Sequence, residues 1–233
     1  LPPGTSVEGG TGSSRSGSVV VVVVPGAVVV GSAGGGAVVA PGAAVVGGAP
    51  GAVVGDEGTV SVLGVDPARA DRRWRSRLGI VLQSVRDLPD ITVAEAVRHF
   101  AGYYPNPRDV DEVIEAVGLT DKATTRGERL SGGQRRRLDV ALGIIGRPDV
   151  LFLDEPTTGF DPEARRGFWT LIEQLKAEGT TILLTTHYLE EAEHLADRVA
   201  IISRGRVLAC DSPALLGGSE AAIARVSCIE GGN

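Results

Sequence analysis

Two adjacent carboxylates follow a run of apolar residues, and this combination is the part of the sequence best suited to chemistry. The run Val150-Leu151-Phe152-Leu153 is followed directly by Asp154 and Glu155. Strands that are buried on both faces have continuous apolar sequences, and open α/β sheets bind ligands beyond the carboxyl ends of their strands. The carboxylate of Asp154 is suited to hold a hard metal cation, because such a cation prefers oxygen ligands. Glu155 is suited to orient or deprotonate a water molecule.

A glycine-containing motif, Leu130-Ser131-Gly132-Gly133-Gln134, precedes a segment with helical apolar spacing at 135–145. The apolar positions of this segment are Leu138, Ala141, Leu142 and Ile145. Ser131 is a favourable N-cap, and Gly132 and Gly133 let a ligand approach the backbone closely. The free N–H groups at a helix N-terminus suit a phosphate. A capped surface helix would explain this motif alone, but the acidic strand end that follows favours a phosphate-binding site.

With both motifs in this order, the segment from about residue 58 to 217 resembles the nucleotide-binding subunit of an ATP-binding cassette (ABC) transporter. Residues 130–134 resemble the family signature, and residues 150–155 resemble the Walker B strand. The resemblance implies an α/β fold of the P-loop NTPase type, with a mostly parallel sheet and an inserted helical subdomain. We therefore expect a truncated ABC ATPase domain at 56–217, with the helical subdomain at about 86–146 and a C-terminal tail at 218–233.

Three further residues match family motifs in the expected order. Gln83, at the end of a predicted strand at 78–83, resembles the Q-loop glutamine. Asp161 resembles the acidic residue of the D-loop, and His187, which follows an apolar segment at 180–185, resembles the switch histidine. A lone glutamine or histidine after a strand is more often structural, so their interpretation depends on their order relative to the other motifs.

The resemblance implies a role for each of these positions. Glu155 and His187 would be catalytic, and Asp154 and Gln83 would bind the metal ion. The residues implied to bind nucleotide are Gln83, Ser131, Gly132, Gly133, Gln134 and Asp161.

The function implied by the resemblance is that of a bacterial, export-type subunit that binds and hydrolyses ATP with Mg²⁺. It would form a head-to-tail homodimer, in which Ser131 and Gly133 contact the γ-phosphate of nucleotide held by the second copy. The expected partner is a transmembrane permease subunit. The expected location is cytoplasmic, peripheral on the inner face of the cell membrane.

Two alternatives belong to other functional classes. One is a non-catalytic, ABC-like regulatory or binding module, against which the intact Glu155 and His187 argue. The other is a soluble ABC ATPase that acts on ribosomes or DNA. A formal net charge of −6 and a single cassette without a basic extension argue against a nucleic-acid partner.

Residues 1–55 differ in composition from the rest of the chain. From Ser18 to Gly55 every residue is Val, Gly, Ala, Pro or Ser, and none is charged. Three interpretations are open: a disordered low-complexity leader, a membrane segment at 19–40, or the translation of a GC-rich gene in the wrong frame. The last would explain the composition because all Val, Ala and Gly codons begin with G, whereas Pro25 and the interspersed glycines argue against a membrane span. We expect this Gly/Val/Ala-rich leader to lie outside the native fold.

The Walker A region, or P-loop, is absent or corrupted. A Gly-x-x-x-x-Gly-Lys-Ser/Thr sequence should occur near residues 34–44, but this window contains no lysine and no hydroxyl side chain. The only lysines in the chain are Lys122 and Lys176, and no aromatic residue that could stack on adenine precedes Trp74. We therefore expect weak ATP binding, negligible hydrolysis, and a sheet in which the N-terminal part of the core is replaced by low-complexity sequence.

Two local patterns concern the predicted helical subdomain. Thr92 and Glu95 match a capping box that would begin a helix extending to about Tyr104. The basic run 135–137 is expected to form a solvated helix face.

Overall fold

The computed structural model describes residues 19–23, 62–82, 90–203 and 206–216. In chain order the elements are β1 Val19–Val23, η1 Pro67–Arg69, α1 Arg72–Arg75, β2 Leu78–Val81, α2 Val93–Ala101, α3 Val110–Ala116, η2 Thr120–Lys122, η3 Gly127–Arg129, α4 Gly132–Ile144, β3 Val150–Asp154, α5 Pro162–Ala177, β4 Thr181–Thr186, α6 Leu189–Leu195, β5 Arg198–Ser203 and β6 Arg206–Asp211. The three η elements are short 3-10 helices.

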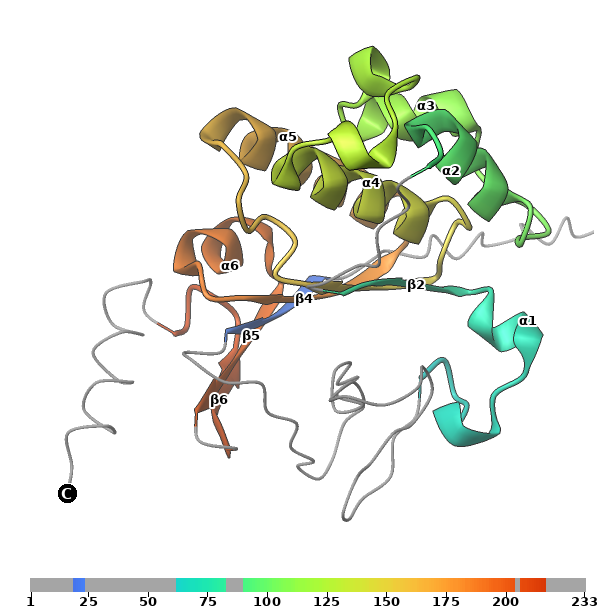
Figure 1. The fold of residues 1–233 in the computed structure, drawn as a ribbon. Coiled ribbons are helices and arrows are strands. Elements are labelled where there is room, and N and C mark those ends of the chain that lie inside the picture. The colour runs from blue at the N-terminus through green and yellow to red at the C-terminus, as the bar shows by residue number, and fades with distance from the viewer. Residues whose placement is uncertain (1–18, 24–61, 83–89, 204–205, 217–233) are drawn as a thin grey trace, which may run out of the picture.

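The described strands form one sheet in the order β2-β3-β4-β1-β5-β6. All neighbouring strands in it are parallel except β5 and β6, which form an antiparallel pair at one edge. Figure 1 shows α2, α3, α4 and α5 on one side of this sheet, and α1 beyond the edge formed by β2. The predicted α/β class, with a mostly parallel sheet and inserted helices between β2 and β3, is confirmed.

The strand β1 was not expected from the sequence. Val19–Val23 lies inside the sheet, pairing in parallel with β4 on one side and with β5 on the other. The expectation that the 1–55 leader lies outside the native fold is therefore wrong for these five valines. Valine is β-branched and uncharged, which suits a strand with neighbours on both sides. The rest of the 1–55 leader lies outside the described residues.

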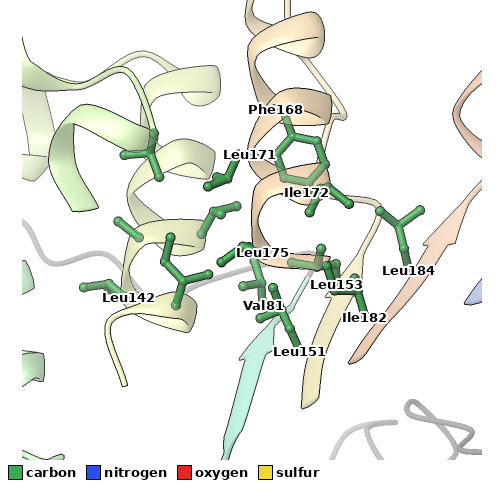
Figure 2. Close-up of a cluster of buried hydrophobic side chains, with 14 of the residues drawn as sticks. Val81, Leu142, Leu151, Leu153, Phe168, Leu171, Ile172, Leu175, Ile182 and Leu184 are labelled. Carbon is green, nitrogen blue, oxygen red and sulfur yellow. The ribbon is translucent and has the colours of Figure 1, made fainter. Parts of the chain in front are cut away.

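The apolar core is divided between the two faces of the sheet. Leu151 and Leu153 of β3 point to the helical side, where they join the cluster around Ile172 and Leu175 of α5 (Figure 2). The alternate residues of β3 join a second cluster on the opposite face, which includes Trp74. This alternation is the period of two expected of a strand, and it confirms that β3 is buried on both faces.

Two glycines allow β2 and α4 to approach closely. A Cβ added at Gly79 would overlap the carbonyl oxygen of Gly143, and one added at Gly143 would lie 2.6 Å from Cγ2 of Val81. The strand that leads to Gln83 is thus packed directly against the helix that follows the Ser-Gly-Gly motif.

The predicted capping box at the start of α2 is present. Thr92 Oγ1 accepts a hydrogen bond from the backbone of Glu95, whose carboxylate accepts one from the backbone N–H of Thr92. The helix ends at Ala101, a few residues before the predicted end near Tyr104. Within the described ranges, no helix is long and apolar enough to cross a membrane.

Candidate functional site

The strand register brings the acidic pair and the histidine to one edge of the sheet. Asp154, the last residue of β3, is the partner of Thr185 in β4. Because the two strands are parallel, Glu155 and His187 both follow strand ends at this edge. Gln83 lies outside the described residues, but Val81 two residues earlier is paired with Leu153.

Glu155 and His187 are in contact. The Nδ1 atom of His187 lies 3.3 Å from Oε1 of Glu155, and both side chains are partly exposed. Glu155 has a φ of 45°, a left-handed conformation that is uncommon for a residue other than glycine. Its backbone N–H donates to the carbonyl of Thr185 at 3.0 Å, which holds this turn against β4. Strained backbone at such a turn is a feature of functional sites, where the surrounding structure maintains it.

Asp154 is held from the side by a neighbouring strand. Its Oδ1 accepts a hydrogen bond of 2.5 Å from the hydroxyl of Thr185. Among the described residues no group of three or more His, Cys, Asp or Glu side chains could hold a metal ion. A single carboxylate next to a hydroxyl nevertheless fits Mg²⁺, which is commonly bound by one or two carboxylates together with substrate phosphates and water.

The Ser-Gly-Gly motif forms the start of α4, as predicted. Ser131 is the N-cap and forms a reciprocal capping box with Gln134, so the side chain of Gln134 accepts a hydrogen bond from the Ser131 N–H at 3.0 Å. Gly133 lies against the turn after β3, because an added Cβ would be 3.3 Å from the carbonyl oxygen of Gly159. At Gly132 an added Cβ would meet open space. Gly132 therefore leaves the helix N-terminus open to a ligand.

A cleft of about 540 Å³ connects this helix start to Glu155. Its lining includes Ser131, Gly132, Gly133, Glu155 and Asp161, all from one chain. Asp161 also caps α5, since its Oδ1 accepts from the Ala164 N–H at 2.8 Å. That hydrogen bond is the main reason why the pKa of Asp161 is lowered. The cleft thus brings together five of the predicted site residues, and His187 adjoins it through Glu155.

Arg136 is a member of this site that the sequence analysis missed. The expectation that 135–137 form a solvated face is wrong for Arg136, which is only 7% exposed. Its guanidinium donates to the backbone carbonyls of Leu82 and Asp154, and its Nε donates to the carbonyl of Pro156 at 3.3 Å. The spacing of four residues from Arg136 to Val140 and Ile144 places it on the buried face of α4, and this signal could have identified it.

Burial also changes the titration of two residues on α4. Desolvation lowers the pKa of Arg136, and the carboxylates of Asp139, Asp154 and Glu155 oppose this shift. Desolvation raises the pKa of Asp139 to about 6, although Arg136 and Arg135 lower it. Asp139 lines the same cleft, so a carboxyl group with a raised pKa shares the cleft with Glu155.

Three kinds of comparison with known proteins are informative. Residues 50–158 match the family described as ABC transporter. A Nod factor export ATP-binding protein I from Burkholderia orbicola is 43% identical over 171 residues, which are 71% of this chain and 56% of that protein. A daunorubicin resistance ATP-binding protein from Streptomyces coeruleorubidus is 42% identical over 164 residues, 68% of this chain and 51% of that protein. The chain spans little more than half the length of these relatives.

Solved structures share the fold. The structure of an ATP-binding subunit of an ABC transporter has a TM-score of 0.71 at 19% identity, over 91% of this chain and 89% of that one. A dimeric ATP-binding cassette in a post-hydrolysis state, bound to ADP and Pi, has a TM-score of 0.61 at 22% identity, over 67% of this chain and 74% of that one.

Proposed function

Because the chain belongs to the ABC transporter family as a nucleotide-binding domain, we propose that it is the ATP-hydrolysing subunit of an exporter. The observation that supports this function best is the contact of 3.3 Å between His187 and Glu155, next to Asp154 at the same strand edge. The name of the Burkholderia relative, a Nod factor export ATP-binding protein, supports the export direction.

Each residue has a role in this proposal that follows from its position. Asp154 would hold Mg²⁺, which when bound would supply positive charge to neutralise the phosphates. Glu155 would accept a proton from the attacking water, or orient it. His187, whose Nδ1 lies 3.3 Å from the Glu155 carboxylate, would hold that carboxylate in place and contact the terminal phosphate. The open N-terminus of α4 offers backbone N–H groups, such as that of Gly132, to a phosphate.

The assembly is part of the proposal as well. We propose a homodimer in which the α4 N-terminus of one copy contacts nucleotide on the other, and a transmembrane permease subunit as partner at the inner face of the membrane. The dimeric ATP-binding cassette with the same fold supports the first of these. Isolation of the chain in complex with a multi-span membrane protein would support the second, whereas isolation with ribosomes or DNA would support the alternative soluble ATPase.

The position of β1 indicates where a P-loop would have to be inserted. A P-loop directly follows a strand and precedes a helix. After Val23, the end of β1, the sequence reads Val24-Pro25-Gly26-Ala27-Val28-Val29-Val30-Gly31-Ser32. Gly26 and Gly31 have the spacing of the two P-loop glycines, but Ser32 stands where the lysine should be. We propose that the chain therefore binds ATP weakly, because it lacks the ammonium group for the β- and γ-phosphates.

One insertion tests this proposal. A lysine inserted between Gly31 and Ser32 creates Gly-x-x-x-x-Gly-Lys-Ser directly after β1, and a glutamine inserted at the same place is the matched control. Equilibrium ATP binding and phosphate release are measured for the three chains. We expect ATP binding and hydrolysis with lysine alone. Micromolar ATP binding by the unchanged chain would contradict the proposed defect, and a folded but inert lysine chain would favour the non-catalytic binding module.

A further inference from the structure

Glu191, on α6, is a buried carboxyl group that the proposed mechanism does not use. Its side chain has no exposed surface. Oε1 accepts hydrogen bonds from the hydroxyl of Thr157 at 2.5 Å and from the indole N–H of Trp169 at 3.5 Å. Oε2 is buried without a hydrogen-bond partner. A carboxyl group in such a place is costly to desolvate, so its presence needs an explanation other than the filling of space.

The partners of Glu191 lie on the segments that carry the candidate catalytic residues. Thr157 is two residues after Glu155, in the turn that leads from β3 to Asp161. Glu191 itself is four residues after His187, on the helix that follows β4. The hydrogen bond between the side chains of Thr157 and Glu191 therefore links the turn of Glu155 to the helix that follows His187.

Trp169, the second hydrogen-bond partner of Glu191, connects α5 to the same carboxylate. Trp169 is in the middle of α5, and its ring stacks on His194 of α6 with centroids 4.5 Å apart. Thr157 is 1% exposed, so its hydroxyl depends on Glu191 as acceptor. A leucine in place of Glu191 would fill a similar volume but would leave the buried Thr157 hydroxyl without that acceptor.

We propose that Glu191 is a positioning residue, which sets the distance between Glu155 and His187 by joining the turn after β3 to α6. The inference rests on the proposed function only because that proposal makes Glu155 and His187 catalytic. The claim that Glu191 sets their distance applies to this chain with or without nucleotide. In this role Glu191 touches neither nucleotide nor water, and it acts through Thr157.

The test measures whether the NMR cross-peak of His187 still responds to a substitution of Glu155. The chain has three histidines, so the imidazole ¹H–¹³C spectrum of the full chain has few cross-peaks to assign, and His99 serves as the remote reference. In the unchanged chain, Glu155→Gln should move the His187 cross-peak at a fixed pH, because Oε1 lies 3.3 Å from Nδ1. The same substitution is then made in a chain that carries Glu191→Leu, as in a double-mutant cycle. There we expect the displacement of the His187 cross-peak to be less than about half of that in the unchanged chain.

Two variants separate positioning from general damage. Glu191→Gln retains an oxygen acceptor for Thr157 and should retain the full response of His187. Glu190→Leu is the same type of substitution at the preceding residue, which is exposed on α6. This variant should also retain the full response of His187. If Glu191→Leu does not fold, Thr157→Val removes the same hydrogen bond from the other side and should reduce the response.

The outcomes distinguish the positioning role of Glu191 from the contact between Glu155 and His187, on which the proposed function rests. A full His187 response in folded Glu191→Leu, or in Thr157→Val when the former does not fold, would overturn the positioning role of Glu191. No response of His187 to Glu155→Gln in the unchanged chain would instead show that the pair is not in contact. That result would remove the main support for the proposed function.

Discussion

Arg136 donates a hydrogen bond to the backbone carbonyl of Asp154, and so joins the helix after the Ser-Gly-Gly motif to the strand that carries the acidic pair. The same guanidinium reaches the carbonyl of Leu82, the residue before Gln83. A single buried side chain thus connects the helix that follows the Ser-Gly-Gly motif, the strand β3 and the segment that leads to Gln83. This arrangement explains why an arginine is buried here, since each carbonyl gains a charged donor.

Replacement of Arg136 should therefore destabilise the protein. Arg136→Met keeps much of the apolar stem but leaves the carbonyls of Leu82, Asp154 and Pro156 without this donor. We expect the free energy of unfolding to fall by about 2 kcal/mol or more, because a buried acceptor that loses its partner is costly. Urea denaturation measures the change. Arg166→Met, at an exposed position of α5, is the matched control and should change stability by less than about 0.5 kcal/mol. Equal losses in the two variants would refute the role given to Arg136.

Glu155 and His187 should affect hydrolysis rather than nucleotide binding. In the chain with lysine inserted after Gly31, Glu155→Gln should lower the rate of phosphate release by about 100-fold or more, since general-base catalysis contributes that much. His187→Ala should also lower it, because the imidazole that contacts the Glu155 carboxylate is lost. ATP affinity, measured by equilibrium binding, should change little in either variant.

His99→Ala provides the control for the histidine. His99 is on α2, where its ring contacts Tyr103, and it should be dispensable for hydrolysis. Hydrolysis that survives Glu155→Gln at the full rate would exclude Glu155 as the base.

The two capping boxes permit a comparison between stability and ligand binding. Ser131→Ala and Thr92→Ala each remove an N-cap hydroxyl, and each should lower the free energy of unfolding by about 1 kcal/mol. In the lysine-inserted chain that also carries Glu155→Gln, ATP should promote dimer formation, which sedimentation can measure. Ser131→Ala should weaken this dimer and Thr92→Ala should not. The proposed contact of Ser131 with nucleotide is wrong if both variants dimerise equally well.

Asp139 should make stability depend on pH. Its pKa is about 6 in the folded chain, above its usual value in an unfolded chain of about 3.9. Between these two values the folded state binds more protons, so the contribution of Asp139 to stability is present at low pH and is lost as pH rises through about 6. Asp139→Asn should therefore stabilise the protein at pH 7.5 by about 1 kcal/mol, less than the full shift implies because the side chain is partly exposed and screened.

The measurement is denaturant unfolding at pH 7.5 and at pH 3.5, where the advantage of Asp139→Asn should vanish. Asp161→Asn is a control of opposite sign. The pKa of Asp161 is lowered by its hydrogen bond from Ala164, so its stabilising contribution is present at neutral pH and lost on acidification. If the free energy of unfolding changed with pH in the same direction for both variants, the raised pKa of Asp139 would be contradicted.

Much of this site could be predicted from local sequence patterns. The start of α2 at Thr92 is predicted by its capping box, which depends on residues three apart. The start of α4 at Ser131 is predicted by an N-cap residue that precedes helical apolar spacing. The strand β3 was predicted from its continuous apolar run, and the acidic pair at its end from the rule that such strands end at ligand sites. These signals depend on neighbours in the chain, so they can be read before any contact between distant segments is known.

Long-range pairing produced the features that the sequence analysis missed. Val19–Val23 has no local property that places it between β4 and β5, because strand order depends on which edges the other strands leave available. The burial of Arg136 depends on three carbonyls, which belong to the residue after β2, the end of β3 and the turn that follows β3. The contact between Glu155 and His187, and the link through Glu191, exist because parallel strands bring residues more than thirty positions apart to one edge. The residue types in the site can thus be read from the chain, whereas their distances depend on the free energy of the whole packed sheet.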